Sequence, residues 1–197
     1  MARRTFFSFH YKRDVWRAKQ VRNSWVTKTD KKASGFFDSS VFESKQRTSD
    51  EALKRFLREG LEGAGVTCVL AGNQTAHRRW VRYELVRSFR VGKGILCARI
   101  HRQKNSKGLT DTAGPDPLAR LAFQVSGDRV LFNEWKNGKW VRYEDAPGMA
   151  LRDVRYALGG RTSGTFSSLF STYDYKTQDG YNKLGEWIEA AARQARR

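Results

Sequence analysis

Three stretches in the first hundred residues are mainly apolar, without the alternation of a half-exposed strand. They read TFFSF at residues 5–9, VTCVLA at 66–71 and ILCARI at 95–100. Runs of this length are typical of strands that are buried on both faces of a parallel sheet. The short stretch GFFD at 35–38 indicates a further strand, which ends on an acidic residue.

Helical patterns occupy the segments between these strands. Asp14 is placed to cap a helix that follows the first strand. Thr48 and Glu51 have the spacing of a capping box, and a helical stripe of apolar residues over 53–64 follows them. A third helix is expected over about 75–90. Strand and helix thus alternate three times, which predicts a right-handed parallel α/β sheet.

The pattern after this region is different. Residues 102–117 hold glycines and prolines among polar residues and predict a loop. Asn137-Gly138 is the strongest short hairpin signal, and a two-residue turn there pairs Trp135 with Trp140 across two strands. The stretch 159–168, rich in Gly, Ser and Thr, is expected to be a plain loop more than a phosphate cradle.

The domain organisation follows from these elements. A chain of 197 residues with 39% apolar and 13% aromatic residues can bury one sizeable core. We expect a single domain over 1–197, with a core at about 4–101, a hairpin insertion at about 118–146 and a last helix at about 180–195.

Charge and cysteine content narrow the partners and the compartment. The net charge of +18 favours anionic partners such as nucleotides, nucleic acid or acidic surfaces, without choosing between them. Cys68 and Cys97 each lie inside an apolar run, which indicates buried, reduced thiols in a cytoplasmic protein. The N-terminal residues hold no apolar stretch long enough for a signal peptide or a membrane span.

Several α/β chemistries lack their residues. A dinucleotide-binding GxGxxG, a P-loop and a GxSxG nucleophile elbow are all missing from the sequence. A receiver domain needs an aspartate at the end of the third strand, where Ala71, Gly72 and Asn73 stand. His10, His77, His101 and the two cysteines show no metal-ligand spacing, so no metal site is expected.

The pentapeptide WVRYE occurs twice, at 80–84 and at 140–144. The second copy follows the hairpin turn, and strand pairing accounts for it. In the first copy, on a helix, Glu84 falls at the edge of the inward stripe between Trp80 and Val81. Burial there would raise the pKa of Glu84. The residues alone leave a second interpretation open, in which Glu84 pairs with a nearby arginine on a solvated helix side.

Linked motifs in one order then resemble a known family. They are FSFHY at 7–11, VRNSW at 21–25, GFFD at 35–38, VTCVL at 66–70, the first WVRYE, and DGY with LGEWI at 179–188. Together they resemble the TIR-like family typified by the Thoeris antiphage sensor. The resemblance runs through about 5–101 and 173–192, and the hairpin region between them carries least of it.

The resemblance implies a flavodoxin-like parallel sheet of order 2-1-3-4-5, flanked by helices, with the active site at the carboxyl ends of the strands. It also implies that NAD is a substrate and that no cofactor is needed. The catalytic glutamate of the family falls on Glu84. NAD would be cleaved between nicotinamide and ribose, and the ADP-ribose cyclised into a signal that activates a partner effector.

The same resemblance suggests which residues bind the substrate, although each also has a structural interpretation as a packing, capping or turn residue. These residues are Ser8, Phe9, His10, Tyr11, Asn23, Asp38 and Trp80. Phe9, His10 and Tyr11 are expected in the loop after the first strand, as a wall that excludes water. Two competing functions remain at this stage: a catalytically silent TIR-like scaffold, which would assemble with partners, and a basic nucleic-acid-binding protein. Assembly into a homo-oligomer is left open for either function.

Overall fold

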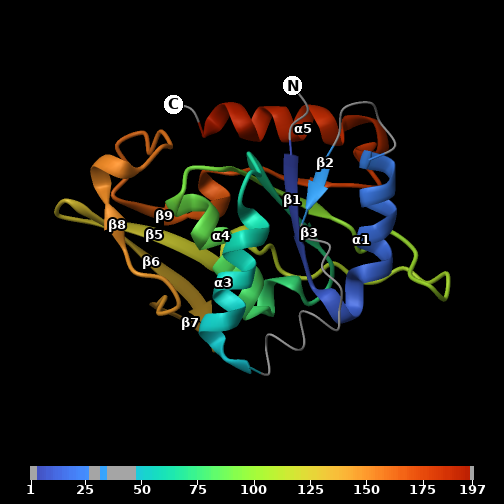
Figure 1. Ribbon diagram of the computed structural model, residues 1–197, viewed down its shortest axis with the longest axis horizontal. Helices are drawn as coiled ribbons and strands as arrows, with labels where there is room; N and C mark the ends of the chain where they lie inside the picture. Colours follow the sequence, from blue (N-terminus) through green and yellow to red (C-terminus); the bar gives the residue numbers. More distant parts are fainter. Residues whose placement is uncertain (1–3, 27–31, 35–47, 196–197) are drawn as a thin grey trace.

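A parallel sheet of five strands forms the centre of the computed structural model, which describes residues 4–26, 32–34 and 48–195 (Figure 1). The strand order is β2-β1-β3-β4-β10, and every neighbouring pair is parallel. This confirms the flavodoxin-like order 2-1-3-4-5. The strands are β1 (Arg4–Phe9), β2 (Lys32–Ser34), β3 (Val66–Ala71), β4 (Gly94–Arg99) and β10 (Thr172–Asp174). The strand expected at 35–38 falls outside the described residues.

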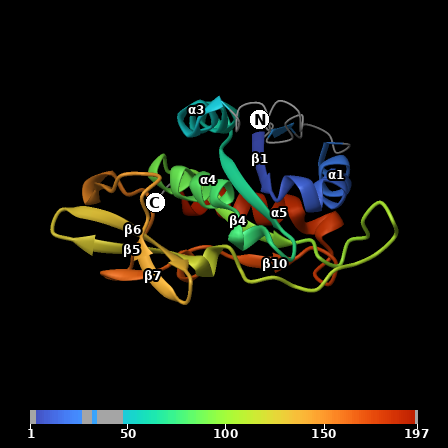
Figure 2. The ribbon, with the colours of Figure 1, turned by 90° about the horizontal axis from the view of Figure 1, so that it is seen from below.

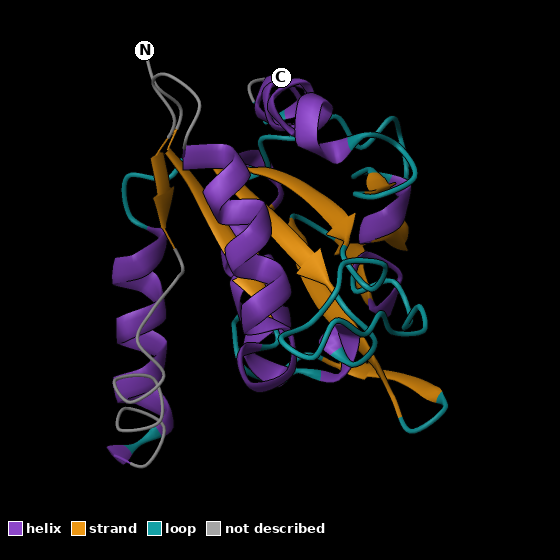
Figure 3. Cartoon of the chain, turned by 90° about the vertical axis from the view of Figure 1, so that its right-hand side faces the viewer, coloured by secondary structure: helices purple, strands orange, loops and turns teal. Residues whose placement is uncertain are grey.

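Helices pack against this sheet (Figure 3). On one face, α1 (Tyr11–Val26) and α5 (Gly180–Gln194) share a buried cluster with side chains of β1, β3 and β4. On the other face, α4 (Arg79–Arg90) packs on the alternate residues of β3 and β4. The helix α3 (Asp50–Leu61) lies beside α4, and a smaller cluster of buried residues joins the two.

Three helix starts differ from the sequence-based expectation. The prediction that Asp14 caps α1 is wrong, because the helix begins at Tyr11 and the backbone N–H of Asp14 already donates to the His10 carbonyl, at 2.9 Å. The cap of α3 is Ser49, whose hydroxyl accepts from the Ala52 N–H at 3.1 Å, one position later than Thr48. The helix expected at about 75–90 is a 3₁₀ turn followed by α4.

A second, antiparallel sheet lies beside the first, on the far side of α4 (Figure 2). Its order is β7-β6-β5-β9, with β8 paired to β6. The predicted hairpin turn is confirmed: Asn137 and Gly138 have φ of 51° and 77°, and Trp135 pairs with Trp140. The strands are β5 (Leu121–Ser126), β6 (Arg129–Lys136), β7 (Lys139–Arg142), β8 (Met149–Ala150) and β9 (Ser163–Thr165).

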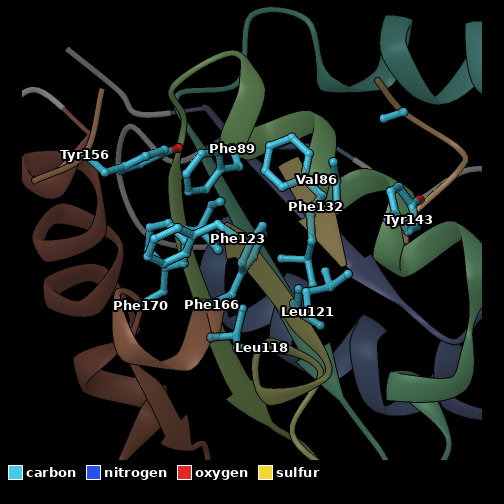
Figure 4. Packing of buried hydrophobic residues seen from close by; sticks show 14 of the residues in the cluster. Val86, Phe89, Leu118, Leu121, Phe123, Phe132, Tyr143, Tyr156, Phe166 and Phe170 are labelled. Atoms are coloured by element: carbon cyan, nitrogen blue, oxygen red, sulfur yellow. The ribbon is translucent and has the colours of Figure 1, made fainter. Parts of the chain in front are cut away.

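The largest buried cluster joins α4 to this second sheet, and Phe89 stands at its centre (Figure 4). Its ring lies 4.7 Å from that of Tyr156, 5.2 Å from Phe166 and 5.4 Å from Phe132. The Tyr156 hydroxyl also donates to the Lys93 carbonyl, just after α4, at 2.6 Å. The helix is therefore held between both sheets, which fixes the side chains that it carries.

Two further expectations concern the cysteines and the membrane. Cys68 and Cys97 are free thiols with no exposed surface, as predicted. Burial raises the pKa of the Cys68 thiol, so it is uncharged at neutral pH. Within the described residues, no helix is both long enough and apolar enough to span a bilayer.

Candidate active site

The carboxyl group of Glu84 lies inside the molecule, on the side of α4 that faces β1. Only 6% of Glu84 is exposed, and its Oε2 accepts a short hydrogen bond from the hydroxyl of Ser8, near the carboxyl end of β1. Burial raises the pKa of Glu84 to about 8, against a smaller lowering effect of the Ser8 hydrogen bond. The interpretation that pairs Glu84 with an arginine on a solvated helix side is therefore wrong.

The turn of α4 that carries Glu84 is anchored to the sheet by hydroxyl groups. Ser88 Oγ donates to the Glu84 carbonyl at 2.7 Å, and it lies 2.7 Å from the hydroxyl of Thr67 on β3. Since Ser88 uses its proton on that carbonyl, Thr67 is the donor to Ser88. These bonds fix the height of Glu84 against the strands.

Phe9 and Tyr11 lie on the opposite face of the sheet from Glu84. Strand alternation turns Ser8 toward α4 and Phe9 toward α1, where Phe9 joins the buried cluster. The rings of Phe9 and Tyr11 stack with centroids 5.5 Å apart. The expected loop is shorter than predicted, because Phe9 ends β1 and Tyr11 begins α1, so only His10 lies between the elements.

His10 is an uncharged side chain at this edge. Burial is the main cause that lowers its pKa to about 4, and the positive charges of Arg78, Arg13 and Lys12 add to the effect. The buried Nδ1 of His10 has no hydrogen-bond partner within the part of the chain that the structure describes. A neutral imidazole with one unused nitrogen is suited to hydrogen-bond a bound molecule.

A second buried carboxyl group, Asp14, was missed as a site feature. It accepts from Arg17 at 3.2 Å and from the Thr75 hydroxyl at 3.4 Å, and burial raises its pKa while Arg17 opposes the rise. Gly72 lies against it, since a Cβ there would stand 2.2 Å from Asp14 Oδ2. Asp14 thus ties α1 to the turn between β3 and α4. The Asp-Arg spacing of three on a helix was the available signal.

Trp80 and Asn23 lie elsewhere. The half-buried Trp80 packs with Tyr83 against α3, and the guanidinium of Arg79 lies 4.5 Å from the centroid of its ring. Asn23 is about 18 Å along α1 from Tyr11, by the rise of a helix. It lines a separate hollow of about 640 Å³ together with Ser24 and Tyr175. Asp38 falls outside the described residues.

The structure thus brings Ser8 and Glu84 together and places His10 at the same edge, between the end of β1 and the start of α1. The buried carboxyl group of Glu84 thus lies near the carboxyl ends of the parallel strands, on the helix after the third core strand, which is the position that the resemblance to TIR-like proteins implied. The fold and the site define a TIR-like domain.

Comparison with known proteins agrees with this class and narrows it. The model of the family described as "Thoeris protein ThsB, TIR-like domain" matches residues 6–105. The chain is also 42% identical, over 192 residues, to "Putative cyclic ADP-D-ribose synthase ThsB1" of Bacillus cereus (strain MSX-D12). That alignment covers 95% of this chain and 100% of the relative. The chain belongs to the ThsB TIR-like family, which confirms the resemblance drawn from its motifs.

Proposed function

We propose that this protein is a cytoplasmic enzyme of antiphage defence that uses NAD as its substrate and makes a cyclic ADP-ribose-type nucleotide. The nucleotide would activate a partner effector. The observation that carries the proposal is the buried Glu84 carboxyl group, which lies beside Ser8 near the carboxyl ends of the parallel strands. It is supported by the relative named "Putative cyclic ADP-D-ribose synthase ThsB1", which this chain matches over that protein's whole length.

The reaction breaks the bond between ribose C1′ and the nicotinamide nitrogen. Nicotinamide leaves with the bonding electrons, positive charge develops at C1′, and a nitrogen of the adenine then bonds to C1′. A carboxylate beside C1′ stabilises that charge. Since the pKa of Glu84 is about 8 in the free protein, the group is mainly protonated at neutral pH. The cationic nicotinamide ring of bound NAD would lower this pKa and favour the carboxylate.

The other groups at this edge would serve binding rather than bond breaking. Ser8 orients the Glu84 carboxyl group, and His10, neutral at physiological pH, offers a hydrogen bond to the substrate. Phe9, Tyr11 and Trp80 are not assigned to the ligand at Glu84, because Phe9 and Tyr11 lie on the opposite face of the sheet and Trp80 packs against α3. Asn23 is not assigned to the ligand at Glu84, because it lines the separate hollow at the other end of α1.

The test compares Glu84→Gln with Glu144→Gln in lysates of phage-infected cells. Both variants change the same residue of the same pentapeptide, but Glu144 is exposed. Mass spectrometry should find the cyclic nucleotide with wild type and with Glu144→Gln, and a loss on the order of 100-fold or more with soluble, folded Glu84→Gln. Product from Glu84→Gln at the wild-type level, or no product from wild type across several phages, would favour a silent scaffold.

Ser8→Ala gives a finer test, because the Ser8 hydrogen bond lowers the pKa of Glu84. The active form is the carboxylate, so kcat/KM of wild type should rise with pH and level off above about 8. Without the hydroxyl the pKa rises further, and the ascending limb should move to higher pH. A profile that falls in height without moving would mean that Ser8 does not act through Glu84.

A further inference from the structure

The outer face of the second sheet has a composition unlike the rest of the molecule. Strand alternation turns one set of side chains to the α4 core and the other set outward. We call the outward set the aromatic-basic face, and its main members are Gln124, Arg129, Asn133, Trp135, Trp140 and Arg142. The outward positions of β5, β6, β7 and β9, all within the described residues, include no Asp and no Glu.

Two tryptophans lie side by side on this face. The rings of Trp135 and Trp140 meet edge to face with centroids 5.4 Å apart. The guanidinium of Arg120 lies over Trp135, 5.7 Å from the ring centroid, whereas Trp140 is 42% exposed. Hairpin pairing accounts for the contact between the rings, but it leaves the indole of Trp140 as an open apolar surface. Together the two rings form a contiguous apolar patch, and patches of this kind are frequent at interaction sites.

A hollow lies beside Trp140. Its volume is about 350 Å³, and the residues that line it include Gln124, Asn133, Ser163 and Thr165 beside the apolar Ala122 and Phe123. Asn133 donates to Gln124 at 3.5 Å, and the Thr165 hydroxyl lies 2.8 Å from that of Ser167. The remaining donor and acceptor positions of these side chains are available next to a flat aromatic surface. Arg142 is exposed and pairs in register with Asn133, so a positive charge borders the same hollow.

We propose that the aromatic-basic face binds single-stranded nucleic acid. A base would stack on Trp140, its edge would meet the amides and hydroxyls of the hollow, and the phosphates would lie against Arg142 and Arg129. This combination of an aromatic platform with basic residues is what single-strand binding requires. It also gives a role to part of the net charge of +18, which one NAD pyrophosphate does not need.

Charge and shape decide against other occupants. A second copy of this chain would bring two faces without carboxylates together, and their arginines would repel. An acidic polypeptide would satisfy the arginines but would leave the indole and the amide-lined hollow without a partner. A base-bearing polyanion uses all three features.

The test measures fluorescence anisotropy of a labelled oligothymidylate with the full-length protein at about 50 and 200 mM salt. The variant Trp140→Ala/Arg142→Gln removes one indole and one charge from the face. The matched control Trp16→Ala/Arg55→Gln removes the same groups from exposed positions on α1 and α3. The face variant should lose affinity on the order of tenfold. Once the thermal unfolding of the control matches that of wild type, its affinity should stay within about twofold of the wild-type affinity. Both double variants lose one positive charge, so a difference between them does not come from net charge.

A second probe separates stacking from charge. An abasic oligonucleotide of the same length keeps the phosphates and lacks the bases. Wild type should bind it more weakly than oligothymidylate, and this difference should be smaller for Trp140→Ala, which keeps the hollow but lacks the indole. The proposal is overturned if wild type does not bind at the lower salt concentration, if both double variants weaken equally, or if poly-glutamate of equal charge competes as well as the oligonucleotide. None of these outcomes depends on NAD turnover.

Discussion

The same five residues, WVRYE, are buried in different patterns in α4 and in the segment that begins in β7. In α4 they follow the helical period, so Val81, Tyr83 and Glu84 are all buried. Tyr83 packs against α3, and Glu84 faces β1. In the hairpin they follow the period of two, which turns Trp140 outward and Tyr143 inward. The secondary structure that the pentapeptide adopts, and not its sequence, therefore determines which of its side chains are buried.

The difference teaches how a carboxyl group becomes chemically special. Glu144 follows β7 and is exposed, where water stabilises its charge. Glu84 is enclosed between α4 and the parallel sheet, and its pKa rises to about 8 because burial disfavours the charged form. The second sheet carries none of the proposed catalytic residues, but it packs on α4 and so helps to fix the position of Glu84.

The largest expected effect is on stability as a function of pH. The pKa of Glu84 is raised in the folded protein, so its contribution to stability is greatest below its usual value of 4.5 and is lost as the pH rises from there to about 8. Glu84→Gln has no such ionisation. Relative to wild type, its free energy of unfolding should therefore increase by about 3 kcal/mol between pH 6 and pH 9.

Urea unfolding at the two pH values measures this change, and Glu144→Gln is the control. Every other titrating group is common to the three proteins, so its contribution cancels in the difference. Glu144→Gln should follow wild type within about 0.5 kcal/mol at both pH values. A constant difference between Glu84→Gln and wild type would show that Glu84 ionises as freely as a surface residue.

Local pattern predicted the buried centre of the fold but not its edge. The strand at 66–71 was predicted with its observed bounds, because all six residues of β3 are buried and none interrupts the apolar run. The fifth strand, β10, has three half-buried residues and no apolar run of its own. It exists because Thr172 and Tyr173 pair with Cys97 and Ala98 of β4, a contact between distant segments that no local pattern records.

The candidate site shows the same division. Helical geometry placed Glu84 at the edge of the buried stripe, and the family resemblance matched it to the catalytic glutamate. Asp14 was misjudged because an aspartate near a helix start is usually a cap. In the structure, Asp14 bonds to Arg17 of its own helix and to Thr75, and it lies against Gly72. Both Gly72 and Thr75 come from the turn after β3. Such a tertiary arrangement has only the Asp-Arg spacing as a trace in the sequence.

The arginines of the two copies offer the next contrast. Arg82 forms an ion pair with Glu134 at 2.8 Å, with only 13% and 12% of the two side chains exposed. Arg82→Gln leaves the Glu134 carboxylate buried without its partner and should cost about 2 kcal/mol of unfolding free energy. Arg142→Gln, on the exposed face, should change it by less than about 0.5 kcal/mol.

A double-mutant cycle with Glu134→Gln checks that the cost comes from the pair. In Arg82→Gln/Glu134→Gln no charge is left without a partner, so part of the lost stability should return, with a coupling of about 1 kcal/mol. Additive losses would mean that Arg82 acts through packing of its stem against the second sheet.

The tyrosines give the smallest effect, and one of opposite sign. The hydroxyl of Tyr83 accepts from Arg58 at 3.3 Å, whereas that of Tyr143 is buried with no hydrogen-bond partner among the described residues. Tyr83→Phe removes a hydrogen bond and should destabilise by about 1 kcal/mol. Tyr143→Phe removes an unsatisfied buried hydroxyl and should be neutral or stabilising by up to about 1 kcal/mol.

Thermal unfolding of the two variants in one buffer measures the contrast directly, because each change deletes a single oxygen from a side chain that is almost fully buried. Tyr83→Phe should unfold about 2–4 °C below wild type, and Tyr143→Phe at or above it. If Tyr143→Phe unfolds as far below wild type as Tyr83→Phe, the two hydroxyls contribute equally to the stability of the folded protein. The two copies would then differ only in their carboxyl and arginine positions.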